Sequence, residues 1–166
     1  DKIGMLATVM NALAVSDKLN QLEGPTEVFT SITMPQVAQP FTRNGALEAM
    51  AAGKIAIFGG GTGNPFFSTD TATALRAVEV SADIMFKATM VDGVYDKDPH
   101  KYPDAKKYAP LPFPKVLEDQ LAVMAGTAAP LCRDNRLPIL VFNLADPDNI
   151  ARAAEGENVG TLVYEE

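Results

Sequence analysis

Short apolar runs alternate with helical patterns along the chain, and this alternation restricts the possible folds more than any other feature. Runs rich in apolar and β-branched residues predict strands at residues 27–34, 54–58, 82–90, 138–143 and 160–164. Apolar residues at helical spacing predict helices at residues 3–19, 41–53, 71–82, 115–129 and 148–154. Nearly continuous apolar strands are typical of a parallel sheet that helices cover on both faces. We therefore expect an α/β fold, a three-layer αβα sandwich with a mostly parallel central sheet.

The chain opens in a helical pattern, with no strand before it. A sheet of this kind ordinarily starts with a strand, so we expect the opening βαβ portion of the fold to be missing from these 166 residues. No internal repeat and no linker divides the sequence that is present. We therefore expect a single domain over residues 1–166.

Composition argues against several classes of function. A single cysteine, Cys132, cannot form an internal disulfide and fits a reducing, cytoplasmic setting. One cysteine also argues against a Cys-based zinc site, and a single histidine, His100, argues against two-His metal chemistry and Ser-His-Asp chemistry. The net charge of −7 and the lack of a Lys/Arg cluster argue against nucleic-acid binding. No apolar run approaches the ~20 residues that span a bilayer, so we expect no membrane association.

A glycine-rich loop between a predicted strand and a predicted helix carries the strongest chemical signal. It covers residues 59–70 and reads GGGTGNPFFSTD. Glycine lets the backbone approach a ligand closely, and the N–H groups at the start of the next helix favour an anion. The loop is neither a Walker A motif nor a GxGxxG fingerprint. The pattern favours phosphate binding, and a tight turn without a ligand is the alternative.

Two further groups of polar residues are candidates for function. Asp70 stands where the helix begins, either as an ordinary capping carboxylate or as a group that holds a catalytic lysine or a metal-bound water. Lys87, Thr89, Tyr95 and Asp98 lie in or after the strand at residues 82–90. Ligands of open α/β sheets collect at the carboxyl ends of strands, so this cluster could bind a nucleotide. A polar surface turn is the alternative.

Together these segments resemble the bacterial uridylate kinases of the amino-acid-kinase superfamily. The resemblance rests on D-x-x-G-M-L-A-T at residues 1–8, on G-T-G-N-P-F-F-S-T-D at residues 61–70, and on K-A-T, V-D-G-V-Y and D-P between residues 87 and 99. It continues through R-D-N, L-P-I and V-F-N at residues 133–143 and through G-T at residues 160–161. Related kinases of the superfamily share the fold but not the G-T-G-N-P-F-F string.

That resemblance implies a reaction and a set of site residues. The γ-phosphate of ATP would pass to UMP with the help of Mg²⁺, a step of pyrimidine nucleotide biosynthesis, and the nucleotide-binding half would cover residues 54–166. Asp70 would orient catalytic lysine side chains, and ATP would contact Lys87, Thr89, Tyr95 and Asp98. UMP would contact Asp1, Thr62, Gly63, Asn64, Pro65, Phe66, Phe67, Ser68 and Thr69. Phosphoryl transfer needs positioning and charge neutralisation rather than a nucleophilic side chain, which agrees with the scarcity of His and Cys.

The resemblance also implies an assembly and its regulation. The family forms hexamers, so we expect a dimer through the helix at residues 3–19 and a hexamer of dimers, with GTP as activator and UTP as inhibitor. The family's opening part, which carries a K-x-S-G lysine and a G-G-G-N loop, is not in this chain, so we expect the chain alone to be a poor enzyme. Ala122 and Ala125 replace the charged residues of the family's K-V-M-D stretch.

Two other functions within the superfamily stay open. The chain could belong to a kinase that phosphorylates a carboxylate, such as an aspartate or acetylglutamate kinase, although such enzymes would lack the G-T-G-N-P-F-F string. It could also belong to a non-catalytic relative that stores or senses an anion. Binding of UMP, compared with binding of aspartate and of molybdate or phosphate, separates the three.

Overall fold

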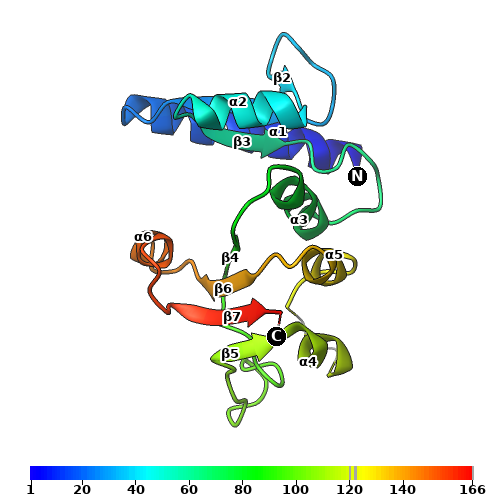
Figure 1. Cartoon of the computed structure of the whole chain (residues 1–166), viewed down its shortest axis with the longest axis vertical. Coiled ribbons are helices and arrows are strands. Elements are labelled where there is room, and N and C mark those ends of the chain that lie inside the picture. Colours follow the sequence, from blue (N-terminus) through cyan, green and yellow to red (C-terminus); the bar gives the residue numbers. More distant parts are fainter. Residues whose placement is uncertain (120, 122, 166) are drawn as a thin grey trace. The chain divides into compact units, whose positions relative to one another are not determined.

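The computed structural model describes residues 1–119, 121 and 123–165, and the chain separates into two compact units, Asp1–Val80 and Ser81–Glu166. Each unit combines helices with a sheet that is largely parallel (Figure 1). The expected α/β fold is therefore confirmed. The assignment of residues 1–166 to one domain stays a prediction. None of the helices in the described part of the chain is long and apolar enough to cross a membrane.

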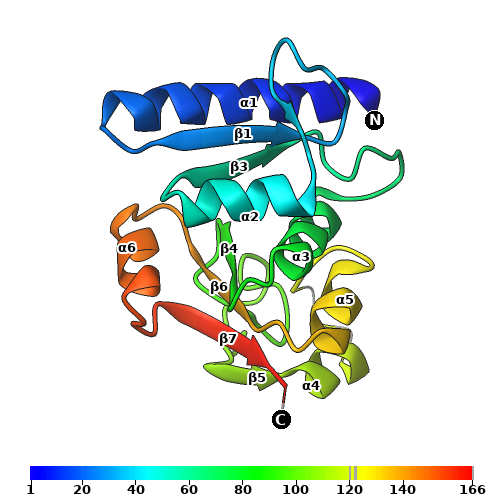
Figure 2. The ribbon, with the colours of Figure 1, turned by 45° about the horizontal axis from the view of Figure 1, so that its top comes forward.

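The first unit is a parallel sheet with a helix on each face. The sheet has the order β2-β1-β3 and consists of β1 (Thr26–Thr30), β2 (Gln39–Pro40) and β3 (Ile55–Gly59). Helices α1 (Lys2–Gln21) and α2 (Arg43–Ala51) lie on opposite sides of it (Figure 2). Successive residues of a strand point to opposite faces. Accordingly Val28 packs with Ala12 of α1, whereas Phe29 packs with Ala46 and Ala49 of α2.

Helix α3 (Thr69–Glu79) completes the first unit and follows β3 through the glycine-rich loop. Its N-cap is Ser68, whose Oγ accepts a hydrogen bond of 3.1 Å from the N–H of Thr71. Thr71, Ala72, Ala74 and Arg76 are buried. The buried side of α3 therefore lies within its first two turns.

The second unit contains a four-stranded sheet of order β4-β6-β7-β5. It consists of β4 (Met85–Thr89), β5 (Pro110–Pro112), β6 (Ile139–Asn143) and β7 (Gly160–Tyr164). Strands β4 and β6 are parallel, as are β5 and β7, whereas β6 and β7 are antiparallel. Helix α6 (Asp148–Ala154) packs through Ala153 on the face that carries Leu140 and Phe142. On α5 (Ala128–Asp134), the thiol of Cys132 lies 4.0 Å from the sulfur of Met85 in β4.

The predicted helix at residues 115–129 is wrong in its extent. The structure has α4 (Phe113–Glu118) and then α5, which begins at Ala128. Gly126 adopts a φ of +54°, a left-handed conformation that interrupts a helix. Ala122, one of the two substituted family positions, lies outside the described residues, and Ala125 is exposed. The short strands β2 and β5, which the sequence did not reveal, are at sheet edges, where proline is tolerated.

Gly160 tests the antiparallel pairing of β6 with β7. A Cβ at this position would collide with the backbone oxygen of Val141, so Gly160→Ala should lower the free energy of unfolding by about 3 kcal/mol. Gly156 in the same unit has open space around it but a φ of +86°, so Gly156→Ala should cost only about 1 kcal/mol. Urea denaturation of both variants measures the difference. Equal losses would contradict the close contact.

Candidate functional site

A cavity of about 220 Å³ opens where the first turns of α1 meet the glycine-rich loop and the start of α3. All of its wall belongs to the first unit. It is lined by Asp1, Gly4, Met5, Thr8, Gly61, Thr62, Asn64, Phe66, Phe67, Ser68 and Thr69. Most of the residues predicted to bind the acceptor substrate are therefore brought together. Gly63 and Pro65 are in the same loop but are not among the lining residues.

Asp1 connects the start of α1 to the far end of the loop. Its carboxylate Oδ2 accepts a hydrogen bond of 3.0 Å from the N–H of Phe66. Although Asp1 occupies the N-cap position of α1, its side chain makes no capping hydrogen bond to that helix. The carboxylate therefore binds the loop instead of capping its own helix.

Thr8 contributes a second connection between α1 and the loop, which the sequence analysis did not assign. Its Oγ1 accepts a hydrogen bond of 2.9 Å from the N–H of Gly60 and donates one of 2.6 Å to the carbonyl oxygen of Met5. Residues 1, 4, 5 and 8 share one face of a helix because of their spacing. That spacing was a signal in the sequence that Gly4, Met5 and Thr8 would line the same wall as Asp1.

The loop requires glycine at two positions. Gly60 and Gly63 have φ values of +82° and +79°, which side-chain-bearing residues rarely adopt. A Cβ on Gly60 would lie 2.9 Å from Thr30 Oγ1, and one on Gly63 would lie 3.0 Å from the backbone oxygen of Ser31. The loop can therefore pack against the end of β1 only because these side chains are absent.

Two aromatic residues of the loop project into solvent. The exposed fraction is 95% for Phe66 and 55% for Phe67, and Phe66 has a φ of +70°. Large aromatic side chains exposed beside a cavity are suited to pack against a flat, partly apolar ligand. Two polar residues of the loop and helix start complete this region. Asp70 is in the first turn of α3. Thr62 Oγ1 accepts a hydrogen bond of 3.2 Å from the N–H of Asn64.

A second polar cluster lies in the second unit, beyond the carboxyl end of β4. The hydroxyl of Tyr95 donates a hydrogen bond of 2.5 Å to Asp92 Oδ1, and Lys107 Nζ is 2.9 Å from Asp92 Oδ2. The hydrogen bond from Tyr95, followed by that from Lys107, lowers the pKa of Asp92. The same contact with Asp92 raises the pKa of Tyr95.

The remaining predicted donor-site residues lie in β4 or in the loop that follows it. Thr89 ends β4, and its carbonyl oxygen accepts a hydrogen bond of 2.8 Å from Leu144 N–H. Lys87 is in the same strand, paired with Val141 of β6. Asp98 Oδ1 accepts a hydrogen bond of 3.0 Å from the N–H of His100, and this contact, followed by Lys101, lowers the pKa of Asp98.

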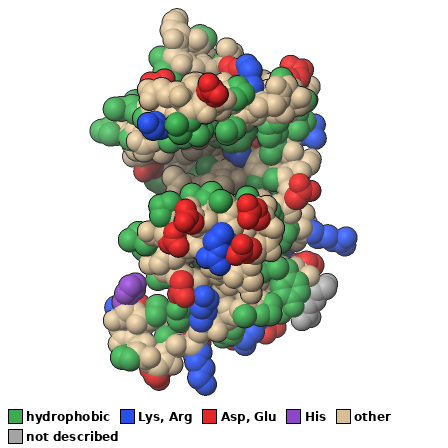
Figure 3. All heavy atoms as spheres, turned by 90° about the vertical axis from the view of Figure 1, so that its left-hand side faces the viewer, with side chains coloured by type: hydrophobic (Ala, Val, Ile, Leu, Met, Phe, Trp, Pro, Cys, Tyr) green, Lys and Arg blue, Asp and Glu red, His purple; other side chains and the backbone are tan. Residues whose placement is uncertain are grey.

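Possible metal-ligating side chains and the charges at the surface also bear on the candidate site. Among the residues that the structure describes, no three His, Cys, Asp or Glu side chains lie close enough together to hold a metal ion. His100 is exposed, and Figure 3 shows it in purple at the surface. On the face shown there, acidic and basic side chains are interspersed.

Comparison with known proteins adds independent findings. The model of the amino acid kinase family matches residues 1–143. The UMP kinase of Ureaplasma parvum is 36% identical, with a TM-score of 0.94 over 98% of this chain and 70% of that chain. The UMP kinase of Bacillus anthracis is 38% identical, with a TM-score of 0.96 over 99% of this chain and 68% of that chain. The uridylate kinase of Archaeoglobus fulgidus is 28% identical, with a TM-score of 0.71 over 97% of this chain and 70% of that chain.

Replacing the tyrosine hydroxyl tests the Asp92 cluster. Tyr95→Phe removes the contact that lowers the pKa of Asp92 most, so that pKa should rise towards its ordinary value in a carboxyl NMR titration. A carboxyl whose pKa is lower in the folded protein than in the unfolded chain stabilises the fold at pH values above its unfolded-state pKa. That stability is lost as the pH falls through its folded-state pKa. The wild type should therefore lose more stability than Tyr95→Phe below about pH 4.

Tyr102→Phe is the matched control, because Tyr102 is in the same unit and contacts Lys97 rather than Asp92. It should leave the pKa of Asp92 where it is. A Tyr95→Phe protein with an unshifted Asp92 titration would show that the hydrogen bond is absent in solution.

Proposed function

Because this chain belongs to the amino acid kinase family, we propose that it forms the acceptor site and part of the donor site of an enzyme that transfers the γ-phosphate of ATP to UMP. The observation that carries the proposal is the cavity of about 220 Å³ between Asp1 and the glycine-rich loop. It joins an anion-binding helix start, a carboxylate and two exposed aromatic rings in one wall. A pyrimidine nucleoside monophosphate presents the complementary groups, which are a phosphate, ribose hydroxyls and a flat base.

Each part of UMP has a matching part of the cavity. The phosphate would lie against the loop and the first turn of α3, because backbone N–H groups and the helix dipole favour an anion there. Asp1 would accept hydrogen bonds from ribose hydroxyls with the carboxylate oxygen that does not hold Phe66. Phe66 and Phe67 would cover the uracil ring, which would explain why two large aromatic side chains are exposed. Thr62, Asn64, Ser68 and Thr69 add hydroxyl and amide groups to the same wall.

The transfer step depends on charges arranged around the moving phosphate. Asp70 is in the first turn of α3, one residue beyond the cavity wall, where a carboxylate can orient lysine side chains or a hydrated cation. Mg²⁺ normally takes its ligands from nucleotide phosphates and one or two carboxylates, and Asp70 is the carboxylate in this position. When bound, the ion would neutralise phosphate charge. Thr89, Tyr95 and Asp98, with Lys87 nearby, would contact ATP.

The proposal extends to assembly and setting. We infer a cytoplasmic enzyme of pyrimidine nucleotide synthesis that assembles as a hexamer of dimers, with GTP as activator and UTP as inhibitor. Helix α1 supports the dimer, because Ile3, Leu6, Met10 and Val15 expose large apolar side chains along it. Several large apolar side chains exposed along one helix are typical of an interaction surface.

Isothermal titration calorimetry on the chain tests the acceptor site. UMP should bind, while aspartate and molybdate should not. Asp70→Asn should change the dissociation constant of UMP by less than about threefold, because a group that acts on the moving phosphate works mainly in the transition state. Turnover is measured on the full-length protein encoded by the gene. It should fall at least about a hundredfold in Asp70→Asn.

The alternative functions give different results in the same experiment. Tight binding of aspartate without UMP would indicate a carboxylate kinase, and binding of molybdate alone would indicate an anion-storing relative. Asp70→Glu, which keeps the charge, is the matched control and should retain more turnover than Asp70→Asn. Parallel losses of UMP affinity and turnover in Asp70→Asn would assign the residue to ground-state binding.

Met10 tests the proposed dimer. Its side chain is 70% exposed, whereas Leu13 packs in its own unit beside Ala12 and Val28. Met10→Glu should therefore split the dimer without unfolding the chain, because a charge buried in an apolar interface costs several kcal/mol. Light scattering at micromolar concentration measures the mass, and Asn11→Glu on the same helix is the control. A wild-type chain that is monomeric under these conditions would contradict the proposal.

A further inference from the structure

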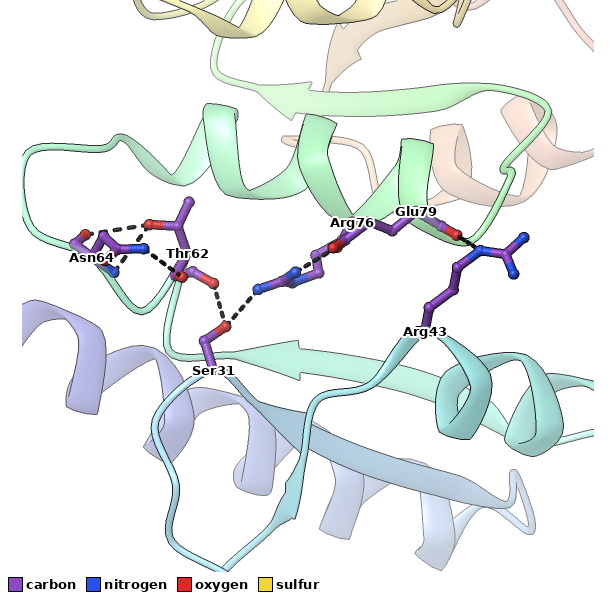
Figure 4. A network of polar contacts seen from close by, with 7 residues as sticks. Ser31, Arg43, Thr62, Asn64, Arg76 and Glu79 are labelled. Atoms are coloured by element: carbon purple, nitrogen blue, oxygen red, sulfur yellow. Dashed lines mark hydrogen bonds and ion pairs between the residues drawn. The ribbon is translucent and has the colours of Figure 1, made fainter.

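Arg76 is a buried charged residue that does not line the cavity. It is in α3, its exposed fraction is 8%, and its guanidinium carbon lies 3.9 Å from the centre of the Phe41 ring. One of its nitrogens forms an ion pair with Glu79, and another donates a hydrogen bond of 2.8 Å to Ser31 Oγ (Figure 4). Because Glu79 matches its charge inside the unit, Arg76 is suited to hold structure rather than to meet a ligand phosphate.

Ser31 also forms a hydrogen bond with the glycine-rich loop and so links Arg76 to it. Its Oγ donates a hydrogen bond of 2.7 Å to the carbonyl oxygen of Gly61. A serine hydroxyl has one proton, and donating it to Gly61 leaves its lone pairs to accept from Arg76. The hydrogen bonds therefore run in one direction, from Arg76 through Ser31 to the loop. Arginine always carries its protons, so the direction of this chain does not depend on pH.

The hydrogen bond to the Gly61 carbonyl also fixes the direction of the Thr62 N–H, which belongs to the same peptide group. In a trans peptide the C=O of one residue and the N–H of the next point in opposite directions, and no cis peptide is present in the described chain. With its carbonyl turned to Ser31, Gly61 directs the N–H of Thr62 away from Ser31. Both Gly61 and Thr62 line the cavity, whereas Ser31 and Arg76 do not.

Ser31 also contacts the loop at a second point. A Cβ on Gly63 would lie 3.0 Å from the backbone oxygen of Ser31 and 3.2 Å from its Cβ. The loop is thus fixed at Gly61 by a hydrogen bond and at Gly63 by close packing. A loop held at two points within three residues keeps its backbone donors in place before the ligand arrives, which lowers the entropy lost on binding.

We propose that Arg76 and Ser31 are a positioning pair that keeps the glycine-rich loop in its ligand-binding conformation and so sets the affinity for the acceptor nucleotide. The identity of that nucleotide as UMP rests on the function proposed above. Neither residue contacts the ligand. Arginine suits this task because its planar fork of donors reaches Glu79 and Ser31 at once while its face stacks on Phe41.

The first test is independent of any ligand and uses hydrogen exchange of the free chain. Ser31→Ala removes the hydroxyl that links Arg76 to Gly61, so amides of residues 60–64 should exchange at least about tenfold faster. Amides of β3 should keep their wild-type rates. Ser31→Thr keeps a hydroxyl and should restore slow exchange in the loop. Unchanged exchange at residues 60–64 in Ser31→Ala would overturn the proposal.

The second test measures UMP binding by calorimetry. Ser31→Ala and Arg76→Lys should each raise the dissociation constant about tenfold, which is the effect of losing a well-placed hydrogen bond. Arg43→Ala is the matched control, because Arg43 donates a hydrogen bond of 2.6 Å to the carbonyl oxygen of Glu79 at the far end of α3. It should leave UMP affinity within about twofold.

The outcomes distinguish a failure of the positioning-pair proposal from a failure of the proposed function. If the wild type binds no UMP but Ser31→Ala loosens the loop, the substrate is wrong and the positioning pair stands. If the wild type binds UMP and both pair variants bind it equally well, or lose affinity only as much as Arg43→Ala, the pair is merely structural. Arg76→Lys retains the charge, so it keeps the test informative if Ser31→Ala fails to fold.

Discussion

The close approach between the end of β1 and the glycine-rich loop is the contact on which the site depends. Gly60 and Gly63 place bare backbone against Thr30 and Ser31, and any side chain there would push the loop away. Once that approach is made, the loop runs from β3 to Ser68, where α3 begins with its first N–H groups directed outward. Asp1 and Thr8 then join α1 to the same loop by hydrogen bonds. The cavity follows from this packing of a strand end, a loop and two helix starts.

The residue types in the cavity wall limit the reactions that this site can support. Its wall carries hydroxyls, amides, one carboxylate and two aromatic rings, but none of its residues is a cysteine, histidine or lysine. A wall of this kind can bind and orient a nucleotide, and it holds no histidine or lysine that could activate one of its hydroxyls as a nucleophile. Phosphoryl transfer suits it because the reacting groups belong to the two substrates. The cluster around Asp92 in the second unit supplies charged and aromatic groups of the kind that a second nucleotide would use.

Much of the architecture and part of the site could be predicted from the sequence. The strand at residues 160–164 and the helix at residues 148–154 have the expected bounds, because apolar periodicity and flanking Gly and Pro mark them clearly. Strands β2 and β5 were not predicted, because strands of two or three residues that include proline carry no periodic signal. The helix at residues 115–129 was overextended because the left-handed φ of Gly126 depends on its surroundings and not on composition. Ser31 and Arg76 could not be linked from sequence, since a contact across 45 positions is fixed only by packing.

The central claim is that UMP binds between Asp1 and the start of α3, and amide chemical shifts during a UMP titration test it most directly. The largest shifts should fall on residues 61–69 and 1–8, which line the cavity or flank its lining residues, and the amides of the second unit should shift least. The same titration with ATP should shift residues 87–98 most. Shifts from UMP that cluster in the second unit, or that are spread evenly over the chain, would contradict the account.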